Sequence, residues 1–106
     1  IGNSPLVLRE SLLDEVYTMG ENFVEAAKRV VAPGMNGPFC IEGVYDENAK
    51  FTSFEFSARI VAGSNIYMDG SPYYSLLFNE SMSMGKRIAR EIKIATEKNQ
   101  LDKITT

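Results

Sequence analysis

The chain has 106 residues, 44% of them hydrophobic, a size suited to one small domain or to part of a larger protein. A net charge of −3 argues against a general nucleic-acid surface, and no apolar run is long enough to span a membrane. The absence of histidine and the single cysteine exclude a Ser-His or Cys-His nucleophile pair, a histidine zinc site and an intramolecular disulfide within the chain. Because the first residue is Ile1 and no signal peptide follows, we expect a segment of a longer cytoplasmic polypeptide.

The first third of the chain predicts a turn, a short strand and a long helix. Asn3 and Pro5 are typical of a turn, and the apolar residues up to Leu8 could form a strand. On composition alone, Asn3 supplies turn geometry. Apolar residues recur every three or four positions over Glu10–Val31, which predicts an amphipathic helix. Gly20 lies on its apolar stripe, and the close approach of a neighbouring element explains this glycine better than a break in the helix.

The middle of the chain predicts an antiparallel hairpin. The apolar runs Pro38–Tyr45 and Phe51–Ile60 flank the polar cluster Asp46–Lys50, a pattern typical of two strands and their turn. Glu42 sits among apolar residues in the first run, and Glu55 sits between two phenylalanines in the second. If the turn has an even number of residues, Glu42 falls directly opposite Glu55.

Two facing carboxylates among apolar neighbours repel each other, which suggests a hard cation such as Mg²⁺ between them. The alternative is that both glutamates lie on the solvent face of a half-exposed hairpin, and the spacing alone favours this alternative, because a one-residue change of register would separate the two carboxylates. Period-2 alternation places Ser57 and Arg59 on the face of Glu55, where the Arg59 guanidinium could bind a phosphate or pair with that carboxylate. Cys40 shares the face of Glu42 and is expected to be a small core residue.

The last third of the chain predicts an aromatic patch and a helix. The patch, Tyr73–Phe78, is expected to be core or subunit interface. Ser81 or Ser83 can cap a helix that runs to about Lys98. Its first turns carry three cations that either approach a phosphate or lie on a solvated face, namely Lys86, Arg87 and Arg90. The whole order predicts an α+β fold in which an antiparallel sheet is backed by helices.

Four stretches of the chain carry a resemblance to a known family. They are GPFCIEG, FEFSARIVAGSN, DGSPYYSLLF and SMGKRIAREIK. They closely resemble the C-terminal part of the archaeal formate-dependent 5-formaminoimidazole-4-carboxamide ribonucleotide (FAICAR) synthetases, which are members of the ATP-grasp superfamily. The similarity runs over essentially all 106 residues. It implies that residues 1–106 form the C-terminal half of an ATP-grasp catalytic domain.

The resemblance also implies a reaction in purine (IMP) biosynthesis. ATP phosphorylates formate to formyl phosphate, and the amino group of aminoimidazole-carboxamide ribonucleotide attacks it, which releases phosphate and forms FAICAR without folate. These small molecules are the expected partners, with no nucleic acid and no membrane, and the aromatic patch predicts a homo-oligomer. The segment by itself should be inactive because it holds only part of an ATP site.

By the same resemblance, Glu42 and Glu55 bind Mg²⁺ (or Mn²⁺) that bridges the phosphates of ATP, which is a substrate. Arg59 is the catalytic residue that would steady the carboxylates or the acyl phosphate, and Asn3 would contact the nucleotide acceptor. The superfamily usually has Glu-x-Asn where this chain has Glu55-Phe56-Ser57, so a third ligand at Ser57 stays open.

Two alternatives remain beside this interpretation. Another ATP-grasp carboxylate–amine ligase would use the same metal site with a different acid or acceptor. A non-catalytic assembly domain would use Tyr73–Phe78 as an interface and leave both glutamates in solvent. A hairpin register that puts Glu42 and Glu55 on opposite faces would favour the assembly domain.

Overall fold

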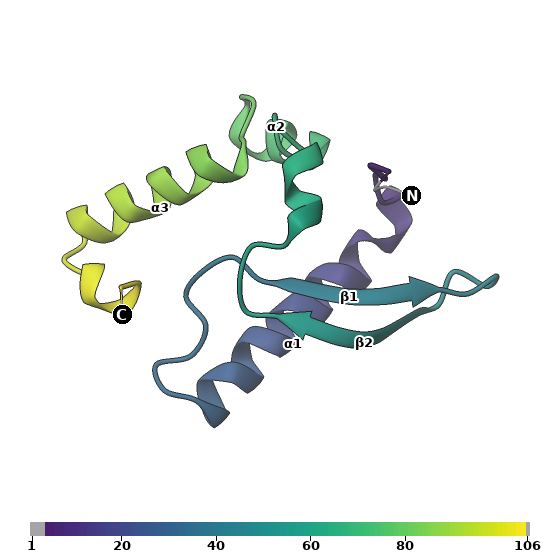
Figure 1. Ribbon diagram of the computed structural model, residues 1–106, viewed down its shortest axis with the longest axis horizontal. Helices are drawn as coiled ribbons and strands as arrows, with labels where there is room; N and C mark the ends of the chain where they lie inside the picture. The colour runs from purple at the N-terminus through teal and green to yellow at the C-terminus, as the bar shows by residue number, and fades with distance from the viewer. Residues whose placement is uncertain (1–3, 106) are drawn as a thin grey trace. The chain divides into compact units, whose positions relative to one another are not determined.

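The computed structural model describes residues 4–105, which form helices, two strands and short 3-10 helices (η) (Figure 1). In chain order the elements are η1 (Glu10–Leu12), α1 (Leu13–Val30), β1 (Cys40–Tyr45), β2 (Phe51–Ser57), η2 (Ala62–Ile66), α2 (Pro72–Phe78), α3 (Met84–Glu97) and η3 (Leu101–Lys103). The chain divides into two compact units: a hairpin unit, Asp14–Val61, and a helical unit, formed by the described residues of Ile1–Leu13 and Ala62–Thr106. The predicted α+β class is confirmed. Within residues 4–105, no helix combines the length and apolar character that crossing a membrane requires.

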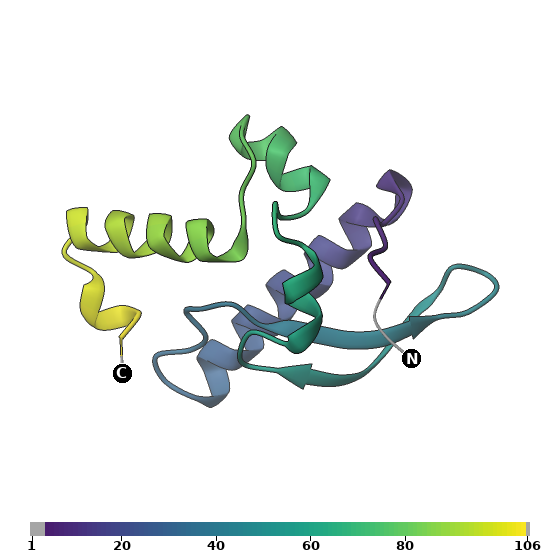
Figure 2. The same cartoon turned by 45° about the horizontal axis from the view of Figure 1, so that its top comes forward.

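The hairpin unit consists of α1 and the antiparallel pair of β1 and β2. In Figure 1 and Figure 2 the hairpin lies across α1, and its turn extends beyond the helix. The ring of Phe23 on α1 lies with its centroid 4.8 Å from that of Phe56 on β2 and 5.2 Å from that of Phe39 before β1. Such aromatic pairs contribute about 0.5–1.5 kcal/mol beyond the area that they bury. Phe23, on the apolar stripe of the helix, therefore packs against the hairpin.

The helix continues through Gly20 without a break, as predicted. The nearest atom to a Cβ built at this position is Phe39 Cζ at 4.0 Å, which is an ordinary van der Waals contact. A neighbouring residue thus does approach Gly20, but not so closely that alanine would be excluded.

The turn of the hairpin is not the even-numbered one that would pair the glutamates directly. Asp46 and Lys50 close it, with the Asp46 N–H donating to the Lys50 carbonyl at 3.1 Å. The Asp46 Oδ1 accepts hydrogen bonds of 2.9 Å from the N–H groups of Asn48 and Lys50, and Ala49 has a φ of 59°. Three residues, 47–49, therefore separate the closing pair. Hairpin loops of three residues are common, and their last residue typically has the left-handed conformation that Ala49 has here. The condition under which the glutamates would pair directly, an even-numbered turn, is therefore not met.

A β-bulge restores the predicted pairing of the glutamates. Counted back from the odd-numbered turn, Glu42 would face Phe54. The pairs from the turn up to Gly43 keep the register that the turn sets, and Gly43 faces Ser53. Beyond it the register shifts by one residue, Phe54 is left without a partner on β1, and Glu42 faces Glu55.

Glycine is required on the β1 side of this bulge. A Cβ at Gly43 would lie 2.3 Å from Cζ of Phe51 and 2.6 Å from the carbonyl oxygen of Thr52. The ring of Phe51 also lies 5.0 Å from that of Tyr45, its cross-strand partner. The aromatic ring thus occupies the space that a side chain at Gly43 would need.

The helical unit contains one helix that was not expected from the sequence, α2. The aromatic patch Tyr73–Phe78 belongs to α2, whose first residue is Pro72. The Ser71 side chain caps this helix by accepting the Tyr73 N–H at 3.3 Å. Leu76 and Leu77 are 77% and 69% exposed, so the patch is only partly core.

Met82 and Ala95 are the buried hydrophobic residues of the described chain. The Met82 N–H donates to the Asp69 carbonyl at 3.1 Å, which ties the start of α3 to the turn before α2. Gly70, in that turn, has a φ of 79°, and a Cβ there would lie 1.9 Å from the Met82 carbonyl oxygen. Ser83 caps α3 by accepting a backbone N–H at 3.2 Å, as predicted.

The strand predicted up to Leu8 does not form. Residues 4–9 belong to no helix or sheet, and the sheet of the described chain has two strands, β1 and β2. The segment is held instead by the hydroxyl groups of Tyr67 and Tyr73. An apolar run predicts a strand only where another strand is available to pair with it.

Candidate functional site

Glu42 on β1 and Glu55 on β2 stand directly opposite each other. Directly opposed residues project to the same face of a sheet, with their Cβ atoms about 4.5–5.5 Å apart. The next pair on this face is Cys40 with Ser57. Phe56 lies between Glu55 and Ser57 and packs against α1, so alternation places the carboxylates on the opposite face of the hairpin.

The carboxylate pair lacks a positive partner within the described residues. Glu42 is half-buried and Glu55 is exposed, and among residues 4–105 no lysine or arginine forms an ion pair with either. Among the described residues, no further cysteine or acidic side chain joins the two glutamates to form a metal-binding cluster of three. Two carboxylates, with the remaining positions open to water and phosphate oxygens, are a donor set that fits Mg²⁺.

The pKa of Cys40, which lies next to the carboxylate pair, is raised. Burial raises the pKa of the Cys40 thiol above its usual 9.0, and the negative charges of Glu42 and Glu55 raise it further. This shift agrees with the register, which puts all three side chains on one face. Cys40 is half-buried, as expected for a small residue packed in a strand rather than for a nucleophile.

We expect alkylation of Cys40 to be slow at pH 8 and to reach half of its maximal rate above pH 9.0. Only the thiolate reacts, and both burial and the neighbouring carboxylates disfavour it. Peptide-resolved mass spectrometry of iodoacetamide labelling across pH gives the profile. Glu55→Gln should move the midpoint to lower pH, whereas Glu47→Gln in the turn should not. An unchanged midpoint in Glu55→Gln would show that this carboxylate does not face the thiol.

Arg59 lies outside the strand that was predicted to orient it. β2 ends at Ser57, so alternation does not determine the face of Arg59. Its Nη1 donates to the carbonyl of Ile60 at 3.0 Å, and among residues 4–105 it forms no ion pair with Glu55. Asn3 lies outside the described residues.

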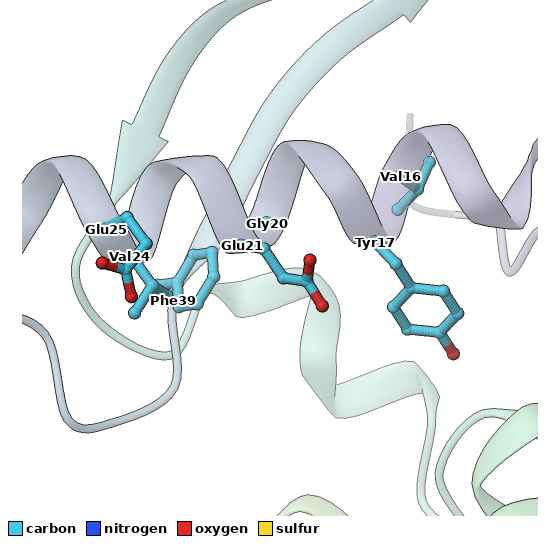
Figure 3. Close-up of a pocket in the computed structure, with 7 residues that line it drawn as sticks. All are labelled: Val16, Tyr17, Gly20, Glu21, Val24, Glu25 and Phe39. Carbon is cyan, nitrogen blue, oxygen red and sulfur yellow. The ribbon is translucent and has the colours of Figure 1, made fainter.

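A separate groove runs along α1 (Figure 3). It has a volume of about 490 Å³, and Figure 3 shows the Phe39 ring lying against the helix beside Val24. The lining residues are Val16, Tyr17, Gly20, Glu21, Val24, Glu25 and Phe39. Neither Glu42 nor Glu55 lines it, so the carboxylate pair lies on the open face of the hairpin and not in this groove.

The three cations at the start of α3 have partners within the helical unit. Lys86 Nζ lies 2.5 Å and Arg90 Nη1 lies 3.6 Å from the carboxylate oxygens of Glu80, and Arg87 pairs with a glutamate four residues on at 2.7 Å. The guanidinium carbons of Arg87 and Arg90 also lie 5.1 and 4.7 Å from the ring centre of Phe78. These contacts join α2 to α3 and account for the cations without a phosphate.

Comparison with solved structures identifies the class of protein to which this fold belongs. The chain is similar over 100% of its length to 37% of the chain in the crystal structure of an IMP biosynthesis protein PurP from Thermococcus kodakaraensis, with a TM-score of 0.80 and 33% sequence identity. The predicted fold class, part of an ATP-grasp protein, is thereby confirmed.

Sequence relatives identify the family. The model described as Domain of unknown function (DUF1297) matches residues 1–106, and the chain belongs to this family. Two similar curated relatives are both named 5-formaminoimidazole-4-carboxamide-1-(beta)-D-ribofuranosyl 5'-monophosphate synthetase. The one from Nitrosopumilus maritimus is 91% identical over 106 residues, which are 100% of this chain and 31% of the relative. The one from Archaeoglobus fulgidus is 55% identical over 104 residues, 98% of this chain and 29% of the relative. The resemblance to FAICAR synthetases is confirmed, and the chain spans less than a third of the length of these relatives.

Proposed function

We propose that the chain is part of an ATP- and formate-dependent ligase that forms FAICAR from aminoimidazole-carboxamide ribonucleotide. The observation that carries this proposal is the direct pairing of Glu42 with Glu55, in a chain 91% identical to a relative named as that synthetase. The pairing also lacks the feature that would have favoured a non-catalytic assembly domain, namely a register with the two glutamates on opposite faces.

Glu42 and Glu55 would hold Mg²⁺, or Mn²⁺, through their carboxylate oxygens on the open face of the hairpin. The bound ion would neutralise negative charge on the phosphoryl group that ATP transfers. Ser57 lies on the same face, two residues beyond Glu55, where its hydroxyl can add a third oxygen. Phe56, next to Glu55 on β2, packs against Phe23 of α1, which helps to hold this part of the strand in place.

The remaining steps in this proposal depend on charge and positioning. Formate attacks the γ-phosphorus of ATP and ADP leaves; the nucleotide's amino nitrogen then attacks the formyl carbon, phosphate leaves and a proton is released. Arg59 would stabilise the acyl phosphate: one of its five N–H donors reaches the Ile60 carbonyl, and a guanidinium suits phosphate oxygens. Asn3 would orient the nucleotide acceptor. Such chemistry needs no histidine nucleophile.

The homo-oligomer stays a prediction within this proposal. Leu76 and Leu77 of α2 expose most of their surface and offer an apolar area for contact between subunits. A second copy of the enzyme is the expected partner, beside the small-molecule substrates.

The proposal is tested by the substrate dependence of ADP release in the full-length polypeptide that contains this chain. Turnover should require ATP, formate and aminoimidazole-carboxamide ribonucleotide together, and FAICAR should appear in the same amount as ADP. ADP release that needs the nucleotide but not formate would indicate an ATP-grasp ligase for another acid. No nucleotide-dependent turnover with any acid would overturn the assignment.

A further inference from the structure

Gly20 lies in the middle of α1, where glycine is unfavourable. Glycine weakens a helix interior relative to alanine, because it loses more conformational freedom on folding. A glycine at such a position usually has a packing reason. Among residues 4–105, however, no atom comes close enough to the Gly20 backbone to exclude alanine, since the nearest atom to a built Cβ is Phe39 Cζ at 4.0 Å. The packing reason must therefore lie outside the described chain.

Gly20 forms a gap in an apolar row along one side of α1. Residues four positions apart lie in a row on a helix surface, and such rows form the ridges and grooves of helix packing. The first row is Val16, Gly20 and Val24, and the row beside it is Tyr17, Glu21 and Glu25. Together with Phe39 these residues line the groove in Figure 3. A side chain from another element can enter the apolar row at its gap.

The groove is an open apolar surface of the hairpin unit. All of its lining residues lie between Asp14 and Val61. The two valines and Phe39 are only half-buried, and Tyr17 is 57% exposed. Within the described chain, the fully buried hydrophobic residues belong to the helical unit. The groove therefore has room and apolar surface for a further packing partner.

The relatives of this chain are much longer than the chain itself. It corresponds to 31% of the Nitrosopumilus maritimus relative and to 37% of the PurP chain whose fold it shares. Most of such a polypeptide thus lies outside the region that this chain covers. The covalent chain keeps a segment of the same polypeptide nearby, so this segment docks without the loss of translational freedom that a separate molecule incurs. This difference favours an occupant from the same polypeptide over a second copy.

The charges at the groove indicate the chemistry of the occupant. Glu25 pairs with Lys28 at 2.7 Å, whereas Glu21 forms no ion pair within residues 4–105. A segment that covers the groove removes water from the Glu21 carboxylate, which is unfavourable unless a cation replaces that water. The occupant should therefore combine an apolar side chain with a positive charge.

We propose that the groove at Gly20 is a docking site inside the full-length polypeptide, filled by a segment from outside these 106 residues. A large apolar side chain of this segment lies between Val16 and Val24 and contacts the Gly20 backbone, and a lysine or arginine of the segment pairs with Glu21. Glycine is then required at position 20, because a side chain there would occupy the same space. The docking site does not depend on the reaction that the full-length protein catalyses.

Thermal unfolding of the full-length polypeptide tests whether the groove is filled. In an open groove Gly20→Ala and Gly20→Leu should raise the melting temperature, because alanine and leucine favour a helix more than glycine does. In a filled groove both should lower it, Gly20→Ala by about 2 °C or more and Gly20→Leu further. Gly85→Ala and Gly85→Leu are the matched controls in α3, where no atom lies within 4 Å of a built Cβ, and neither should lower it. A rise with the Gly20 variants would overturn the proposal.

Glu21→Gln tests the charge of the occupant. If the carboxylate pairs with a cation in the filled groove, its loss should lower the melting temperature of the full-length polypeptide. Glu47→Gln, which removes the same charge from the exposed turn, should leave that temperature unchanged. An unchanged melting temperature in Glu21→Gln would overturn the assignment of a cation to the groove.

A photoreactive benzoylphenylalanine in place of Tyr17 identifies the occupant. Irradiation of the full-length polypeptide, followed by peptide mass spectrometry, should give a cross-link within one polypeptide to a residue outside these 106. The same probe in place of Glu47 should not form this cross-link. A cross-link to residues 62–105, a product of doubled mass that joins two copies, or the absence of any cross-link would each overturn the proposal.

Discussion

Replacing Glu42 or Glu55 by glutamine in the full-length enzyme is expected to lower formate-dependent ADP release at least about a hundredfold, equivalent to about 2.7 kcal/mol. Each substitution keeps the shape of the side chain but removes one of the two charges that face each other across the hairpin. A neutral amide is a weaker ligand for a hard cation. Initial rates measured over a range of Mg²⁺ concentrations should show that each variant needs more Mg²⁺ for half-maximal activity.

The matched control is Glu47→Gln, which removes the same charge from the exposed turn of the same hairpin and should retain full activity. Thermal unfolding without Mg²⁺ adds a second control. There, Glu42→Gln should be at least as stable as the wild type, because it relieves repulsion between facing carboxylates. Activity of the Glu42 and Glu55 variants within threefold of wild type would mean that both are ordinary surface residues.

Gly70→Ala is expected to destabilise the helical unit by about 3 kcal/mol. The residue has a φ of 79°, a conformation that alanine adopts only with strain, and the added Cβ would lie 1.9 Å from the Met82 carbonyl oxygen. Relief of that overlap requires Met82, the fully buried side chain of the unit, to move. Urea unfolding of the full-length protein, together with hydrogen exchange of η2 and α2, measures the effect.

Gly85→Ala provides the comparison within the same unit. Gly85 lies in α3, and no atom lies within 4 Å of a Cβ built there. Alanine should therefore be neutral or stabilise the helix by up to about 1 kcal/mol. Equal stability of Gly70→Ala and Gly85→Ala would contradict the tight contact between Gly70 and Met82.

Helices with strong periodicity or clear capping residues could be predicted from the sequence. The predicted helix Glu10–Val31 corresponds to η1 and α1, and α3 begins after the predicted cap Ser83. The helix α2 was missed because seven residues are too few for an apolar period to stand out. Its start signal was nevertheless present, as a serine followed by Pro72.

The direct pairing of Glu42 with Glu55 was anticipated only for an even-numbered turn, and the structure reaches it by another route. Glu42 faces Glu55 because an odd-numbered turn is combined with a bulge, and beside the bulge the ring of Phe51 fills the space next to Gly43. Contacts of this kind involve tertiary geometry that strand alternation does not contain. The hydrogen bonds of Tyr67 and Tyr73 could not be predicted for the same reason, since their partners are backbone groups about sixty positions away.

The bulge also decides which changes of chain length the hairpin can accept. Gly43 pairs with Ser53 and Glu42 pairs with Glu55, so Phe54 is one extra residue in β2. Without it, the two strands would pair as a regular antiparallel ladder. A chain that lacks Phe54 would keep every one of these pairs, including Glu42 with Glu55. A deletion in β1 between Glu42 and the turn would instead enlarge the mismatch between the strands. The strand β2 can therefore lose one residue at Phe54 while Glu42 and Glu55 remain paired.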